Sequence, residues 1–114
     1  MSYTDAFKAL SGTFTEAVQI ANPKQIDQAG TYLLFGSSKP INLSEHKPSF
    51  ILVLCANSYE KKNGLIPLID EMTDRIKEST FAMELVSIKR AELLSTTLYS
   101  VALEISIEIN ITEE

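Results

Sequence analysis

The chain has 114 residues and a formal net charge of −5, with 45% hydrophobic and 22% charged side chains. This size and composition fit a single domain, residues 1–114, and exclude a disordered protein, a disulfide scaffold and a membrane-spanning chain. Residues 1–90 balance ten bases against ten acids, whereas residues 91–114 carry five glutamates and no base, so tight binding to DNA or RNA is not expected. The single cysteine and the lack of a visible secretory signal favour a reducing compartment.

An amphipathic helix is predicted near the N-terminus, where Thr4 or Asp5 can cap it and Asn22-Pro23 would end it. Gly12 and its Ser and Thr neighbours weaken the intrinsic helix propensity, so packing has to hold this helix. Its apolar stripe, at helical spacing, consists of Phe7, Leu10, Phe14 and Val18.

Two strands are predicted next, separated by a loop. Thr31–Phe35 predicts a short strand between glycines. Lys39–Pro48 holds two prolines without periodicity and predicts a loop. Phe50–Ala56 is a continuous apolar run rich in branched residues, which is typical of a central strand buried on both faces.

A second helix is predicted after the polar connection Asn57–Gly64. Pro67 fits its first turn, and charged residues cover the side away from the core. Its apolar stripe consists of Leu65, Ile69, Met72 and Ile76. Phe81–Lys89 predicts a third strand, and Ala91–Thr97 predicts a turn region.

The C-terminal segment has the strongest pattern in the chain. Large apolar residues occupy every odd position from Tyr99 to Ile111, and small, polar or acidic residues occupy the even positions. This period of two predicts a strand with one buried face. A strand over Leu98–Ile111 would run about 45 Å at roughly 3.3 Å per residue. A compact, rounded domain of this length has a radius of gyration of only about 13 Å, so the strand would be longer than its own domain. We therefore expect either that a bulge bends it over its own core or that its end reaches a neighbouring subunit.

The elements together predict an α+β domain in the order α-β-β-α-β-β. We expect a mostly antiparallel, four-stranded sheet with two helices packed on one face. The order of elements is twofold, but no internal sequence repeat accompanies it.

Catalytic and metal-binding patterns are scarce. His46 is the single histidine, so a metal site of familiar ligand spacing is not expected, and no cofactor is expected. Cys55 with His46 could form a nucleophile pair, but a thiol inside an apolar strand is far more often core. Asp70 and Asp74 are better explained by a solvated helix face than by acid–base chemistry. A turn explains Gly64 better than an anion site does, so we do not expect an enzyme.

The segments FILVLCANSYEKKNGLIPLIDEMTDRI (Phe50 to Ile76) and LYSVALEISIEINI (Leu98 to Ile111), in this order of elements, resemble the tail terminator (tail-completion) proteins of long-tailed bacteriophages and Mu-like prophages. The resemblance implies a structural subunit of a ring, usually of six copies, that caps the tail tube. It implies tail-tube and neck proteins as partners, and a location in the virion tail and, during assembly, in the host cytoplasm.

Two sets of residues are candidates for this assembly role. Glu104 and Glu108 could line a lumen through which DNA slides without tight binding, because like charges repel; an ordinary solvated sheet face is the alternative. The loops predicted at Lys39–Pro48 and Asn57–Gly64 are the candidates for subunit or partner contacts. Their candidate contact residues are Lys39, His46, Lys47, Tyr59, Lys61 and Lys62.

Two other functions stay open on the sequence. One is a small acidic adaptor or secretion-chaperone-like homodimer that binds a protein partner, which would expose apolar patches and form a two-fold dimer. The other is a small enzyme or ligand-binding domain that uses the region of Cys55, His46 or Asp70.

Overall fold

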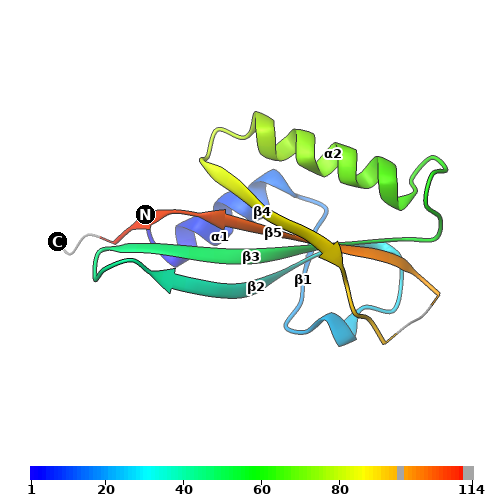
Figure 1. Ribbon diagram of the computed structural model, residues 1–114, viewed down its shortest axis with the longest axis horizontal. Coiled ribbons are helices and arrows are strands. Elements are labelled where there is room, and N and C mark those ends of the chain that lie inside the picture. The colour runs from blue at the N-terminus through cyan, green and yellow to red at the C-terminus, as the bar shows by residue number, and fades with distance from the viewer. Residues whose placement is uncertain (95–96, 112–114) are drawn as a thin grey trace.

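Two helices and a mixed sheet make up the chain in the computed structural model, which describes residues 1–94 and 97–111 (Figure 1). The elements of this described part are α1 (Tyr3–Thr13), β1 (Val18–Gln19), the 3₁₀ helix η1 (Pro23–Gln25), β2 (Gly30–Pro40), β3 (Glu45–Ala56), α2 (Leu65–Glu78), β4 (Met83–Arg90), β5 (Tyr99–Ile107) and β6 (Ile109–Asn110). The predicted α+β class is confirmed. The sheet differs in detail from the prediction, because the described residues form six strands with one parallel pairing.

The strand order is β1-β2-β3-β5-β4, and β6 continues along β3 beyond β5. β1 pairs with β2 in parallel, and the other neighbours are antiparallel. The predicted loop at Lys39–Pro48 is wrong, because β2 and β3 form one long hairpin whose turn is only residues 41–44. Asn42 closes this turn, since its Oδ1 accepts hydrogen bonds from the backbone N–H groups of Ser44 and Glu45, both at 2.8 Å.

α1 is shorter than predicted and has a different cap. Ser2 caps it, and Asp5 returns the bond to the Ser2 backbone N–H in a capping box. The helix ends at Thr13. The next residue, Phe14, has a non-helical backbone, but its N–H still donates to the Leu10 carbonyl oxygen. Val18 therefore lies in β1, where it is exposed.

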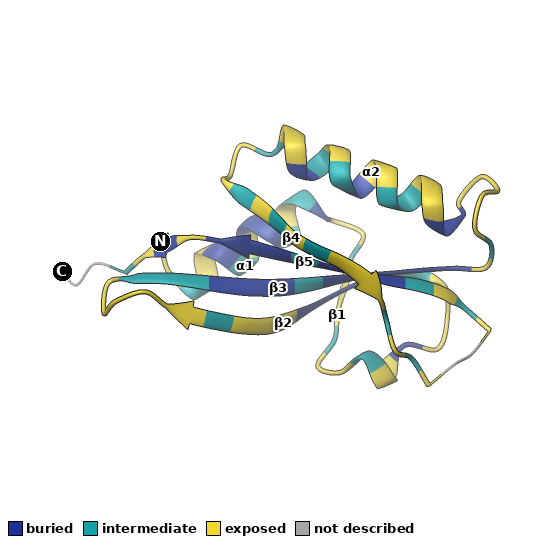
Figure 2. Ribbon diagram, viewed as in Figure 1, coloured by how far each residue is buried: buried dark blue, intermediate teal, exposed yellow. Residues whose placement is uncertain are grey.

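Both helices pack on the same face of the sheet, as predicted, and bury the main core there. Ala6 and Ala9 are small enough to bring α1 close to the strands, while Leu10 and Phe14 fill the remaining space. Figure 2 shows burial running along β3 and β5 in the middle of the sheet, with much more exposure on β2 and β4. The odd-numbered residues of β5 from Val101 to Ile107 face this core, which confirms the predicted alternation there, whereas Tyr99 is exposed and packs against Tyr59.

A second, smaller core lies on the other face of the sheet. It contains Cys55 and Val53 of β3, Tyr32 and Leu34 of β2, and Ile26. Residues from the segments before β2 and after β4 pack against it, among them Ile20 and Leu93. β3 is therefore covered on both faces over this half, as its apolar run predicts.

The C-terminal strand does not outrun its own domain. β3 spans twelve residues, and β5 and β6 pair with it in one continuous register, from Ala56 opposite Tyr99 to His46 opposite Ile109. Pro48, which has no N–H to donate, lies in β3 between its long ladder with β5 and its short ladder with β6. The sequence prediction failed because it assumed a round domain, whereas the molecule is 49 Å long and supplies an equally long partner strand.

Three other predicted elements remain. The second helix is confirmed at Leu65–Glu78, and the third strand is confirmed at Met83–Arg90. In the predicted turn region, residues 91–94 form no helix or strand, and residues 95–96 lie outside the described part. Neither helix is long and apolar enough, within that part, to cross a membrane.

Candidate functional site

The face of the sheet opposite the helices carries Glu104 and Glu108, as the alternation of β5 requires. Glu108 is exposed and Glu104 is half-buried. The neighbouring strands add bases to this face, since Lys89 of β4 stands opposite Ala102 and Lys47 of β3 belongs to the same row as Ser49. This face therefore carries charges of both signs. The charged residues that β5 and the junction with β6 contribute to it, Glu104 and Glu108, are both acidic.

Lys47 and Glu84 form an ion pair that reaches across β5. The Lys47 Nζ lies 2.6 Å from Glu84 Oε2, and Ser106 Oγ donates to the same oxygen at 3.4 Å. The hydrogen bond raises the pKa of Lys47 and lowers the pKa of Glu84, because it stabilises the charged form of each partner. Lys47 was predicted in a contact loop, but it is a strand residue that is already partnered within the sheet.

His46 and Lys39 were also predicted in a loop, and the structure places both in the long hairpin. The Tyr3 hydroxyl lies 2.6 Å from His46 Nδ1 and 2.7 Å from Ser38 Oγ, and the Tyr3 and His46 rings meet edge to face. This cluster fastens the start of α1 to the hairpin, so His46 has a structural role. Lys39 is exposed near the end of β2.

The connection between β3 and α2 is a loop, as predicted, and it exposes Tyr59, Lys61 and Lys62. The Tyr59 ring packs against Tyr99 with a centroid distance of 4.0 Å. The start of α2 is closed to anions, because the N–H groups of Leu65 and Ile66 already donate to the carbonyl oxygens of Ser58 and Tyr59, and Pro67 has no N–H. Gly64 is required for close packing, since a Cβ there would lie 2.5 Å from the Tyr59 carbonyl oxygen.

Cys55 and His46 do not form a catalytic pair. They lie nine residues apart in one strand, which is about 30 Å at roughly 3.3 Å per residue, and they point to opposite faces. Burial raises the pKa of the Cys55 thiol to about 11, so the thiolate is scarce at neutral pH. Cys55 is a core residue of the smaller cluster.

The acidic residues of α2 show no acid–base arrangement, and Asp70 and Asp74 are both exposed. Their neighbour Arg75 has a role that sequence reasoning missed. Its guanidinium bonds Glu71 within α2 at 3.1 Å and Glu16, after α1, at 2.5 Å, which connects the two helices. In the described residues no group of three or more His, Cys, Asp or Glu side chains could hold a metal ion.

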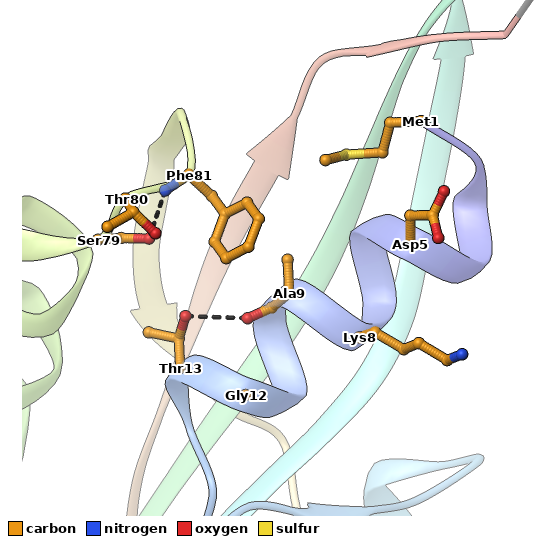
Figure 3. A pocket seen from close by; sticks show the side chains of 9 residues that line it. All are labelled: Met1, Asp5, Lys8, Ala9, Gly12, Thr13, Ser79, Thr80 and Phe81. Carbon is orange, nitrogen blue, oxygen red and sulfur yellow. Dashed lines mark hydrogen bonds between the residues drawn. The ribbon is translucent and has the colours of Figure 1, made fainter.

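A groove of about 560 Å³ lies between α1 and the connection from α2 to β4 (Figure 3). Phe81 and Met1 supply apolar surface, and Asp5 and Lys8 supply one charge of each sign. Two hydroxyl groups drawn there bond to the backbone: Thr13 Oγ1 donates to the Ala9 carbonyl oxygen at 2.9 Å, and Ser79 Oγ accepts from the Phe81 N–H at 3.1 Å. This groove holds no catalytic constellation.

The two edges of the sheet are the surfaces that sequence reasoning did not locate. In the described part of the chain, β1 covers β2 only at Tyr32 and Leu33, and β4 pairs with β5 alone. Both free edges carry exposed apolar side chains. They are Phe35, Ile41 and Leu43 in and just after β2, and Phe81, Val86 and Ile88 in and just before β4.

A scan against protein-family models finds no match to this chain, and a search of curated proteins finds no match to it either.

Proposed function

We propose that the protein is a structural subunit that joins copies of itself head to tail into a ring of the tail-terminator type. The observation that carries this proposal is that, within the described residues, the sheet has two different edges without a partner strand, along β2 beyond Leu33 and along β4, and both carry exposed apolar residues. A free edge is a template for pairing with another chain. Contacts between two unlike surfaces generate rings when the rotation closes, whereas a two-fold dimer uses one surface twice.

The resemblance of Phe50 to Ile76 and of Leu98 to Ile111 to tail terminators supplies the biological role in this proposal. The ring would cap a phage or prophage tail tube and meet the neck proteins, and the exposed loop with Lys61 and Lys62 is a candidate for those contacts. The absence of an assembled catalytic or metal site in the described residues is compatible with a structural role.

The second candidate function is an adaptor or chaperone-like dimer. The exposed Phe81 beside the groove of Figure 3 favours it, because apolar surface of this kind can hold a protein client. Negative-stain images of the purified protein separate the two functions. The ring proposal predicts closed rings at high protein concentration, and a uniform field of two-fold dimers would contradict it.

The proposal includes passage of DNA along the face that bears Glu104 and Glu108. We expect the double variant Glu104→Lys, Glu108→Lys to fold normally and to gain DNA affinity that falls as salt rises, because each new phosphate contact releases counterions. A gel shift at two salt concentrations measures this change. The matched control is Asp70→Lys, Asp74→Lys on α2, and equal DNA binding by both double variants would remove the reason to place DNA at the sheet face.

A further inference from the structure

We propose that β2 of one copy pairs antiparallel with β4 of the next copy, in the register that sets Lys39 opposite Glu84 and Phe35 opposite Ile88 of the neighbour. This pairing deepens the proposed function and rests on it, since it names the two surfaces that join the copies. It would make the six-stranded sheets continuous from one copy to the next.

The β-bulges of the two edges match in this register. β2 has one extra residue, Gly36, between the pairs that Phe35 and Ser37 make with β3. β4 has one extra residue, Val86, between the pairs that Leu85 and Ser87 make with β5. A bulge shifts which face the following side chains point to, so an unmatched bulge would set helix-side residues against residues of the other face.

Aligned bulges preserve the faces along the whole contact. On the helix side, Phe35 meets Ile88 and Ser38 meets Leu85. On the other side, Lys39 meets Glu84. A shift by two residues in one direction sets Ser37 opposite Ile88 and breaks this agreement. The opposite shift keeps the faces but sets Leu33 opposite Ile88, where β1 already covers the edge of β2.

The backbone hydrogen-bonding groups are also in phase. The Leu33 carbonyl oxygen accepts from Ile20 N at 3.0 Å, so Leu33 turns its polar groups toward the free edge, and alternation gives Phe35 and Ser38 the same direction. In antiparallel strands the backbone N–H and C=O groups of successive residues point alternately to the two neighbouring strands. Following this alternation from β2 through β3 and β5 shows that the backbone groups of Leu85 and Ile88 point toward the free edge of β4. The pairs Phe35–Ile88 and Ser38–Leu85 can therefore each exchange two hydrogen bonds.

The side chains at these edges complement each other. Phe35 is 54% exposed and Ile88 is 44% exposed in the single chain, and the pairing would shield both from water. Lys39 and Glu84 carry opposite charges, which favours a directly opposed cross-strand pair. Glu84 already pairs with Lys47, but its side chain is still 60% exposed and can accept from a second base. The same register brings the exposed Ile41 at the hairpin turn to the neighbour's Phe81.

A two-fold pairing of β4 with β4 also aligns its bulges, with Glu84 opposite Lys89, and is the main rival. It leaves the edge of β2 open. It also brings two copies of α2 near each other, because α2 packs over β4. Each α2 carries four acids and two bases, so the two helices would repel each other. The head-to-tail pairing instead sets α2 near α1 of the next copy, which Tyr3 holds over β2 and whose Asp5 and Lys8 cancel.

Disulfide trapping distinguishes these arrangements. In a Cys55→Ala background, single variants Lys39→Cys and Glu84→Cys are mixed, oxidised and resolved on a non-reducing gel. We expect about tenfold or more mixed dimer relative to a mixture of Lys62→Cys with Glu84→Cys, because opposed cysteines react at a high effective concentration. The parallel mixture of Lys89→Cys with Glu84→Cys should stay at the control level.

Cross-linking in the Lys89 mixture in place of the Lys39 mixture would overturn the proposal in favour of two-fold dimers, and control-level products in both mixtures would overturn this register. The result also separates this proposal from the ring itself. Rings in images without formation of the Lys39–Glu84 disulfide would support the ring and refute the register. Formation of the disulfide without rings in images would support the register and refute the ring.

Discussion

The Ile105→Lys variant should fail to fold. Ile105 has no exposed surface and lies in the main core, where its strand neighbours are Phe50 of β3 and Leu85 of β4. An unpaired ammonium there should cost more than about 4 kcal/mol, which is most of the roughly 5–15 kcal/mol that stabilises a typical domain. Thermal unfolding followed by circular dichroism should show no cooperative transition.

Glu104→Lys is the matched control, because it places the same side chain one residue earlier on the other face. Glu104 is half-buried and lies on the sheet face opposite α1 and α2, so we expect the melting temperature of this variant to stay within a few degrees of the wild-type value. A normal melting curve for Ile105→Lys would mean that the odd face of β5 is not the core.

The Phe14→Ala variant should lose about 3–5 kcal/mol of unfolding free energy, the usual cost of deleting a buried aromatic ring. Phe14 is only 1% exposed and lies at the C-terminal end of α1. This helix has a weak intrinsic helix propensity, and its other buried side chains are the small Ala6 and Ala9. Its packing on the sheet therefore depends on Phe14 and Leu10. Urea unfolding measures the loss.

Phe35→Ala makes the same deletion on the exposed edge of β2 and is the control for Phe14→Ala. It should change the unfolding free energy of the single chain by less than about 1 kcal/mol. Equal losses in the two variants would contradict the assignment of Phe14 to the core and of Phe35 to a free edge.

The parts of the fold that the sequence predicted well are those with a strong period. The unbroken alternation from Tyr99 to Ile111 defined both the strand and its buried face, since a one-residue slip would expose every large side chain. α2 was equally clear, because Leu65, Met72 and Ile76 recur at helical spacing and Pro67 marks the first turn.

The long hairpin could not be predicted from local sequence. Pro40 and Pro48 suggested a loop, yet Pro40 lies at the end of an edge strand and Pro48 lies where the pairing is interrupted, which are places that tolerate a missing N–H. The helix limit was missed for a similar reason. Val18 continues the helical spacing, but Phe14 leaves the helix and the chain returns to pair with β2.

The candidate contact surfaces could not be predicted from the sequence, because they depend on the order of the strands in the sheet. Nothing local in Phe35 or Ile88 says that β2 and β4 are edges, since that follows from β3 and β5 lying between them. Of the predicted contact residues, Lys39 is exposed in the single chain, whereas Tyr3 binds His46 and Glu84 binds Lys47 within the chain.

The head-to-tail ring is tested most directly by one mass measurement. A double variant with Lys39→Cys and Glu84→Cys in the Cys55→Ala background is oxidised at high concentration, and the mass of the resulting assembly is determined. A closed ring uses every edge, so native mass spectrometry should find one dominant species of three or more chains with no free thiol. A ladder of open chains with free thiols at their ends, or dimers alone, would contradict the ring.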